Sequence, residues 1–305
     1  MRNPSSGAPH GTAHEGGKRE VMQTKMSRRQ FLKIGVSAVV GVGAAGGAYA
    51  SLWEPHQLDI TRLTLALPSL PKAFDGIKVV QFSDLHLGFH TGAKDVARLV
   101  QAIQQEKPDM ICFTGDMVDG NIEDMRAAIQ PFTELKAPLG LFSILGNHDY
   151  DDYEDVETLI SMEEEAGFHV LRNTAVKLRR EGAVIAVAGL DDVFWGQPDP
   201  AAAIQDLPEG MFKLLLMHEP DYADTTAAYS FHLQLSGHSH GGQIRLPWIG
   251  EVITPPGAKR YVQGLYTTGS QGMLLYVNRG IGTTQLPFRF LCKPELTVLT
   301  LRSMA

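Results

Sequence analysis

The feature that most constrains the fold is a series of short apolar runs that alternate with amphipathic stretches from residue 59 onward. An apolar run of four to eight residues is long enough for a buried strand and too short for most helices. Strands that alternate with helices favour an α/β sandwich over an all-helical or an all-β domain. The clearest strand candidates are residues 77–83, 110–114, 141–145, 184–189, 212–217, 231–236, 273–278 and 295–301.

Helical patterns lie between the early strand candidates. Apolar residues recur at intervals of three and four over residues 93–106, 122–135 and 154–166, with charged residues between them. After residue 170 the strands follow one another more closely and are separated by Gly and Pro. Because no repeat or boundary divides residues 51–305, we expect them to form one domain.

Polar side chains follow five of the strand candidates at the point where each strand ends. Loops beyond the carboxyl ends of strands converge on one crevice in α/β sheets, so residues far apart in the sequence can meet there. The residues at these positions are Asp84, His86, Asp116, Asn147, His148, His218, His238 and His240.

Seven of these residues have side chains that suit borderline divalent cations. Two carboxylates, one amide and four imidazoles fit Mn, Fe or Zn, which accept mixed oxygen and nitrogen ligands. Seven ligands are too many for one closed site. If one carboxylate bridged two ions, each ion would have four protein ligands and room for water, as a hydrolytic centre requires.

The same residues form five motifs in a fixed order. These are D-L-H at 84–86, G-D-M-V-D at 115–119, G-N-H-D at 146–149, the single His218, and G-H-S-H at 237–240. Together they resemble the calcineurin-like metallophosphoesterase superfamily, whose pattern is D-x-H, G-D-x-x-D, G-N-H-D/E, H and G-H-x-H. The resemblance covers about residues 77–241. It implies a four-layer α/β/β/α sandwich of two mixed sheets flanked by helices, and a phosphoric ester hydrolase.

The resemblance also assigns a role to each residue. Asp84, His86, Asp116 and His240 would hold one metal, and Asp116, Asn147, His218 and His238 the other. A hydroxide that bridges the two ions would attack phosphorus in line with the leaving group. His148 would donate a proton to that group. Asp119 would orient the His148 ring, or it would accept backbone N–H groups of its own Gly-flanked turn instead.

One departure from the family pattern informs the substrate. Many phosphoprotein phosphatases of this superfamily read G-D-x-x-D-R-G, whereas here Gly120 follows Asp119 directly. A dianionic monoester gains most from the missing arginine fork, so we expect a phosphodiester or pyrophosphate substrate and favour a phosphodiesterase. Arg279 and Arg289 are further candidates for contacting the phosphate, although no motif supports them.

Two other functions remain open. The first is a pyrophosphate hydrolase that acts on a lipid-linked nucleotide sugar such as UDP-2,3-diacylglucosamine in lipid A synthesis. The second is a non-catalytic, metal-stabilised protein that binds the cell envelope. The acidic residues Asp149, Asp151, Asp152, Glu154 and Asp155 fit a solvated helix start better than a third metal site.

Residues 1–50 have the composition of a targeting segment. Residues 1–25 lack periodicity and are expected to be disordered, and Met26 is an alternative start to Met1. The paired Arg28 and Arg29 precede an uncharged, Gly-rich stretch at 34–50, which is the arrangement of a twin-arginine signal. This stretch is marginal for spanning a bilayer, so it either ends in cleavage after Ala50 or stays as an anchor.

Both outcomes place residues 51–305 outside the cytoplasm, in the periplasm, in the cell wall or on the outer face of the cytoplasmic membrane. The expected partners are the twin-arginine export machinery and a phosphate-ester small molecule or envelope component. Residues 1–50 hold seven basic and two acidic side chains, so residues 51–305 carry 20 basic against 32 acidic ones, a net charge of −12. Such an acidic domain has no general affinity for nucleic acid.

Overall fold

The computed structural model describes residues 26–119, 122–150 and 156–304. The chain divides into two compact units, Met1–Ala45 and Gly46–Ala305, and the second unit is called the body below. Helix α1 (Arg28–Ala48) has no buried residue and continues into a short π-helical turn, Tyr49–Trp53, and a 3₁₀ turn, Glu54–His56. The helical segment 28–56 contains an 18-residue window with a mean hydropathy of 1.6, so by length and composition it could cross a membrane.

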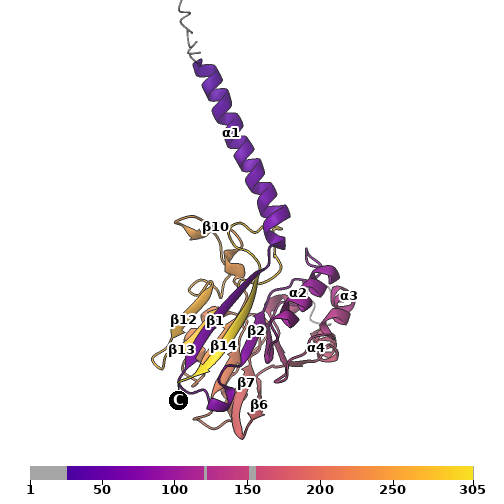
Figure 1. Ribbon diagram of the computed structural model, residues 1–305, viewed down its shortest axis with the longest axis vertical. Helices are drawn as coiled ribbons and strands as arrows, with labels where there is room; N and C mark the ends of the chain where they lie inside the picture. Colours follow the sequence, from indigo (N-terminus) through magenta and orange to yellow (C-terminus); the bar gives the residue numbers. More distant parts are fainter. Residues whose placement is uncertain (1–25, 120–121, 151–155, 305) are drawn as a thin grey trace, which may run out of the picture. The chain divides into compact units, whose positions relative to one another are not determined.

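Two six-stranded mixed sheets form the body (Figure 1). In the first sheet, β2, β3, β4 and β5 are parallel, β14 runs antiparallel to β2, and β1 pairs in parallel with β14. The order across the sheet is β1 (Asp59–Leu67), β14 (Glu295–Ser303), β2 (Lys78–Phe82), β3 (Met110–Thr114), β4 (Leu141–Ile144) and β5 (Phe168–Val170).

The second sheet has a parallel centre with an antiparallel strand at each edge. Its order is β12 (Gly264–Thr268), β13 (Met273–Val277), β9 (Leu233–Ser236), β8 (Lys213–Leu216), β7 (Ala183–Gly189) and β6 (Thr174–Arg180). A separate two-stranded hairpin pairs β10 (Arg245–Leu246) with β11 (Gly250–Glu251).

Three apolar clusters show that the layers are stacked in the predicted order, helices, sheet, sheet, helices. Alternate residues of β2 point to opposite faces, so Val80 packs under the helices while Val79 packs between the sheets. The outer face of the first sheet is covered by α2 (Ala93–Gln105), α3 (Glu123–Phe132) and α4 (Val156–Glu165). The outer face of the second sheet is covered by the short α5 (Pro200–Ile204) and α6 (Ala223–Thr226) with adjoining loops.

The predicted strands are the interior ones. All eight strand candidates correspond to strands flanked by neighbours on both sides. In the two six-stranded sheets, the four strands without a predicted counterpart, β1, β5, β6 and β12, are the four sheet edges, and the short strands β10 and β11 of the hairpin have no predicted counterpart either. An edge strand is less completely buried and mixes polar with apolar residues, as the partly exposed pattern of β1 shows. Continuous apolar runs in the sequence therefore mark the central strands, whereas the edge strands have no such run.

Candidate active site

The carboxyl ends of both sheets carry the site. Asp84 and Asp116 lie two residues beyond the ends of β2 and β3 in the first sheet, and His218 and His238 lie two residues beyond β8 and β9 in the second. Three 3₁₀ turns, at Asn147–Tyr150, Pro220–Tyr222 and His240–Gly242, follow strands at this same edge. The two sheets thus supply complementary halves of one site.

Close backbone packing joins these two halves. The His238 N–H donates to both carboxylate oxygens of Asp84, at 3.0 and 3.1 Å. A side chain at Gly237 would overlap Ser83, and one at Gly146 would overlap Asp116. The glycines of the G-N-H-D and G-H-S-H motifs are therefore needed for close approach of the chain segments.

Five of the seven predicted metal ligands have a left-handed backbone conformation, which non-glycine residues seldom adopt. Such backbone strain is maintained only where surrounding structure fixes it, and it is concentrated at functional sites. The five residues and their φ values are Asp84 (54°), His86 (47°), Asp116 (60°), His238 (65°) and His240 (49°).

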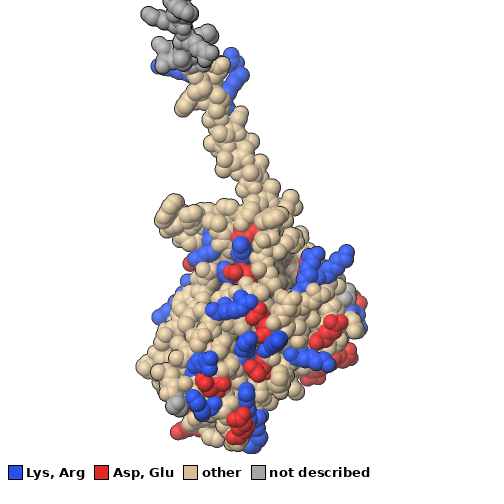
Figure 2. All heavy atoms as spheres, viewed as in Figure 1, with Lys and Arg blue, Asp and Glu red and all other residues tan. Residues whose placement is uncertain are grey.

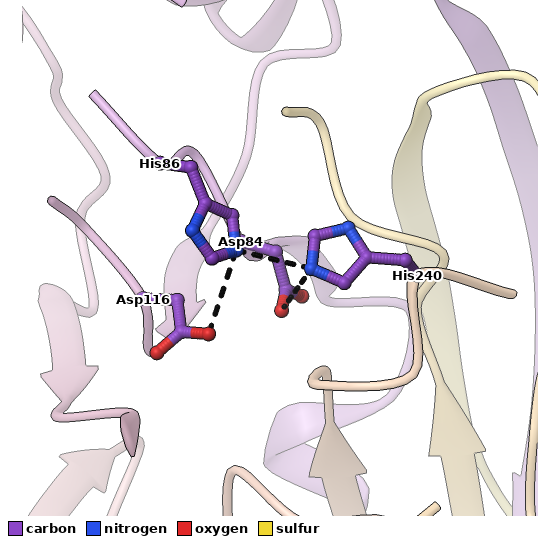
Figure 3. A group of neighbouring side chains, drawn as sticks. All are labelled: Asp84, His86, Asp116 and His240. Carbon is purple, nitrogen blue, oxygen red and sulfur yellow. Dashed lines mark hydrogen bonds and ion pairs between the residues drawn. The ribbon is translucent and has the colours of Figure 1, made fainter. Parts of the chain in front are cut away.

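The first group of ligand atoms comprises Asp84, His86, Asp116 and His240 (Figure 3). All four residues are buried, and one ligand atom from each lies within 4.8 Å of the others. His86 Nε2 lies 3.0 Å from His240 Nε2 and 3.5 Å from Asp116 Oδ2. His240 Nε2 lies 3.4 Å from Asp84 Oδ1. The side chains thus point toward one another around a common centre, as ligands of one ion do.

The second group shares Asp116 with the first and adds His218 and His238. His218 Nδ1 donates to the carbonyl of Thr114 at 2.6 Å, and His238 Nε2 donates to the carbonyl of Pro256 at 2.7 Å. A carbonyl only accepts hydrogen bonds, so each ring has its proton on that nitrogen. The other nitrogen, Nε2 of His218 and Nδ1 of His238, keeps its lone pair for a metal.

The donor atoms fit divalent cations. Among the described residues, His218 Nε2 and Asn147 Oδ1 are buried without a hydrogen-bond partner, which is costly unless another group satisfies them. His218 Nε2 lies 3.2 Å from Asp116 Oδ2, an oxygen shared by both groups. Unpartnered nitrogen and oxygen atoms around a shared carboxylate are the donor set expected for two neighbouring ions.

Burial keeps His238 and His240 neutral, which is the form that binds metal. Burial, followed by the charge of His218, lowers the pKa of His238 to about 4. Burial and the charge of His86 likewise lower the pKa of His240. Although burial alone would raise it, the pKa of Asp116 is held well below its usual value by His218 and His86. The carboxylate shared by the two groups is therefore ionised at neutral pH.

His148 and Asp119 form a pair at the edge of the metal groups. His148 Nδ1 lies 2.8 Å from Asp119 Oδ1, and the His148 ring packs edge-on against His86 with centroids 4.6 Å apart. The pKa of Asp119 is held below its usual value, first by His86 and then by His148. An ionised Asp119 accepts a hydrogen bond from His148 Nδ1–H and thereby fixes the orientation of the ring. Of the two roles predicted for Asp119, the geometry matches the orienting one.

The prediction for Asp149 as part of a solvated helix start is wrong. Its side chain is buried, and its carboxylate accepts backbone N–H groups from Asp116 (2.9 Å), Met117 (2.7 Å), Val118 (3.2 Å) and Gly146 (2.8 Å). Asp149 therefore ties the Asp116 loop to the loop that carries Asn147 and His148. The other acidic residues of that group, 151–155, lie outside the described part of the chain.

The two arginines suggested as phosphate contacts are both engaged elsewhere. Arg279 forms ion pairs with Asp59 at 2.8 Å and Glu295 at 3.1 Å. Arg289 is fully buried and donates to backbone carbonyls, among them those of Gly282 and Cys292. Both residues are structural because their donors are used within the fold.

A cavity of about 400 Å³ opens beside the metal groups. Its floor includes Asp116, Asn147, His148, His238 and His240, and most of its walls are apolar. No Lys or Arg belongs to the described residues that line it. The apolar wall residues are Phe194, Trp195, Ile244, Val252, Ile253, Pro255, Pro256 and Leu286.

Comparison with known proteins gives the same family as the motifs. A family model described as calcineurin-like phosphoesterase matches residues 77–242. The chain is 45% identical over 285 residues to YkuE, an uncharacterized metallophosphoesterase of Bacillus subtilis (strain 168), which covers 92% of this chain and 99% of that protein.

Two other relatives have more specific names. The phosphodiesterase YaeI of Escherichia coli (strain K12) is 31% identical over 282 residues, covering 90% of this chain and 99% of that protein. The UDP-2,3-diacylglucosamine pyrophosphatase LpxG of Chlamydia trachomatis serovar D is 29% identical over 323 residues, covering 88% and 98%.

Proposed function

The chain belongs to the calcineurin-like phosphoesterase family, and we propose that it is an exported phosphodiesterase that uses two divalent metal ions. The observation that carries this proposal is the meeting of two metal-ligand groups at Asp116, on the floor of one cavity. A site that only stabilised the fold would be closed, whereas this one borders a space large enough for a substrate.

The ligand assignment follows the two groups. Asp84, His86, Asp116 and His240 would hold one ion, and Asp116, Asn147, His218 and His238 would hold the second. Mn, Fe and Zn all suit these donors. When bound, such ions supply the positive charge that neutralises a phosphodiester and acidifies water at the site.

His148 is the proposed general acid. Its side chain is partly exposed, lines the cavity, and is held by Asp119 at 2.8 Å. Asp119 accepts from Nδ1 and so fixes the ring at the cavity lining, where a protonated imidazole can donate to the oxygen of a leaving alcohol. Asp119 acts through His148 and is a positioning residue.

The charge around the cavity favours a diester over a monoester. The described lining has no guanidinium or ammonium group, and Arg279 and Arg289 are bound within the fold. A monoester dianion would lose the most from the lack of such a partner. A diester carries one charge, which the metal ions alone can offset.

A retained N-terminal anchor places the enzyme on the outer face of the cytoplasmic membrane. Ala50 is buried, and its carbonyl accepts the N–H of Arg289 at 2.9 Å. The adjacent Glu54 is fully buried, with its carboxylate accepting the N–H groups of Leu291 and Cys292. A peptide bond held in this way is a poor substrate for a signal peptidase, so residues 34–50 stay attached.

Localisation tests the export proposal. In spheroplasts, added protease should degrade the body, and alkaline carbonate should leave the full-length chain in the membrane fraction. Replacing Arg28 and Arg29 by Lys should leave the body inside and protected. Protection of the unaltered protein would favour the second candidate, a pyrophosphate hydrolase on a cytoplasmic lipid-linked nucleotide, which the relation to LpxG supports.

Metal analysis and a substrate panel test the chemistry. Protein purified from its native compartment should contain two Mn, Fe or Zn ions per chain and hydrolyse bis-p-nitrophenyl phosphate faster than p-nitrophenyl phosphate or a pyrophosphate diester. Asp116→Asn should lose most of the metal and the activity together. Two bound ions with no hydrolysis of any ester would instead support a non-catalytic envelope-binding protein.

A further inference from the structure

The β10–β11 hairpin presents an apolar tip to solvent. Its loop is Pro247-Trp248-Ile249, where Trp248 is 103% exposed and Ile249 is 72% exposed. Trp248 also has φ 64°, a left-handed conformation that is rare for a bulky aromatic residue. Both the exposure and the strained backbone are unfavourable in an isolated soluble domain, which indicates that the tip has a partner.

The segment that follows α1 lies against the base of this hairpin. The Tyr49 ring packs edge-on against Phe290 with centroids 6.2 Å apart. Phe290 in turn pairs with the hairpin base, because its N–H donates to Gln243 at 2.9 Å and its carbonyl accepts from Arg245 at 2.8 Å. Contacts within the body thus connect the anchor's exit, residues 49–54, to the hairpin.

Exposed apolar side chains are concentrated around these segments, which sit at the end of the body remote from the C-terminus (Figure 1). Figure 2 shows the hairpin projection in tan, with no charged side chain at its tip. We call this set the apolar face. Its members are Leu52, Trp53, Leu246, Trp248, Ile249, Ile253, Leu286 and Leu291.

The apolar face continues into the wall of the active-site cavity. Ile253, which follows β11, and Leu286 belong to both, and they are 76% and 52% exposed. The loop of Leu286 is fixed to the hairpin base because the Gln243 side chain bonds the backbone of Thr284 at 2.9 and 3.0 Å. A molecule that covers the face therefore also reaches the mouth of the cavity.

The charge pattern indicates that the apolar face binds a lipid bilayer rather than a charged partner. Arg245, the basic residue at the hairpin base, is paired with Glu251 at 3.0 Å, and the tip carries no charge. The net charge of −12 over residues 51–305 opposes binding to an acidic surface. An exposed Trp beside aliphatic residues, next to the exit of an apolar helix of membrane length, is typical of a protein surface at the lipid–water interface.

We propose that the apolar face docks into the lipid bilayer and that the cavity takes its substrate, an amphiphilic phosphodiester, from that bilayer. The docking face rests on the retained anchor, and the substrate class rests on the phosphodiesterase function proposed above. The hydrophobic tip enters the interface, the apolar cavity wall accepts the proximal part of the acyl chains, and the phosphate lies over the metal ligands.

Fluorescence quenching tests the docking directly. The sequence has three Trp, so Trp53→Phe with Trp195→Phe leaves Trp248 as the only one in the full chain. In phosphatidylcholine vesicles, bromine on the acyl chains should reduce Trp248 emission by about half or more, without any requirement for anionic lipid. The matched control adds Trp248→Phe and Leu265→Trp, which moves the single Trp to β12.

The control should show little quenching because Leu265 lies on β12, an edge strand of the second sheet that is not part of the apolar face. Equal quenching of the two variants would overturn the proposal. Blue-shifted Trp248 emission that bromine leaves unchanged would also overturn it, because a protein partner or a second copy would then cover the tip.

Turnover tests the route of the substrate. Trp248→Ser with Ile249→Ser should leave hydrolysis of soluble bis-p-nitrophenyl phosphate within about twofold, since neither residue lines the cavity. Hydrolysis of a two-chain lipid p-nitrophenyl phosphodiester in vesicles should fall about tenfold. Leu265→Ser with Met304→Ser, which removes two exposed apolar residues elsewhere, should keep both activities.

Failure of the phosphodiesterase function and failure of substrate supply from the bilayer would give different results. If the unaltered protein hydrolyses neither ester, the phosphodiesterase proposal fails, while quenching of Trp248 still supports the docking. If the unaltered protein hydrolyses both esters, and Trp248→Ser with Ile249→Ser hydrolyses the lipid ester in vesicles as fast as the Leu265→Ser with Met304→Ser control, supply of substrate from the bilayer is refuted.

Discussion

Asp149→Asn tests how the fold holds the bridging ligand. The two oxygens of Asp149 divide four N–H groups between them, with Met117 and Val118 on Oδ1 and Asp116 and Gly146 on Oδ2. An amide replaces one oxygen by an NH₂ group, which leaves two buried N–H groups facing a donor instead of an acceptor. Each unsatisfied buried group costs about 1–3 kcal/mol, so the expected loss of stability is about 2–6 kcal/mol.

Urea unfolding of the metal-free full chain at pH 8 measures this loss. Burial and the charge of Asp116 raise the pKa of Asp149 to about 7, so the native carboxylate is ionised at pH 8. Metal content should fall in parallel because the Asp116 loop is no longer fixed.

Asp75→Asn is the matched control. Asp75 also accepts a backbone N–H, from Ser303 at 2.9 Å, but at a site where water can replace it. This change should leave the unfolding midpoint and the metal content close to those of the unaltered protein. If Asp149→Asn behaves in the same way, the proposed role of Asp149 in fixing the loops is refuted.

Three further predictions concern the site. His148→Ala should keep both metals and lose about a hundredfold or more in turnover on unactivated diesters, with a smaller loss on p-nitrophenyl esters; equal losses would contradict the acid role. Gly237→Ala should destabilise the protein by about 1–3 kcal/mol and lower metal content, because its Cβ would overlap Ser83, whereas Gly210→Ala, with open space around it, should do neither. Burial lowers the pKa of His238 to about 4, so protons should displace metal from this residue only well below pH 6.5. Metal content measured after dialysis at a series of pH values checks this prediction. Metal release centred near pH 6.5 would contradict it.

Local sequence determined the site better than it determined the sheet edges. Each motif residue follows a continuous apolar run, and the ends of such runs place Asp84, Asp116 and His218 on one rim wherever the strands are parallel. Edge strands such as β1 and β6 carry no comparable signal, because their side chains are less completely buried and their sequences mix polar with apolar residues.

The role of Asp149 could not be predicted from the sequence. It lies in an acidic run beside a predicted helix, and local composition alone suggests a solvent-exposed residue. Its burial depends on the β3 and β4 loops coming together, which is a contact across more than thirty residues. The G-N-H-D motif therefore identifies Asp149 as a family residue but does not reveal its role.

The sequence by itself determined which side chains end each strand, that an uncharged, Gly-rich segment precedes the body, and which family the motifs belong to. Only the tertiary structure decided which ring nitrogen of His218 and His238 bonds a backbone carbonyl, that Arg279 and Arg289 are used within the fold, and that Trp248 is exposed to solvent. The physical reason is the distance along the sequence between the residues that interact. Strand ends and apolar length are set by neighbours along the chain, whereas hydrogen-bond partners and exposure are set by segments that meet only after the two sheets pack.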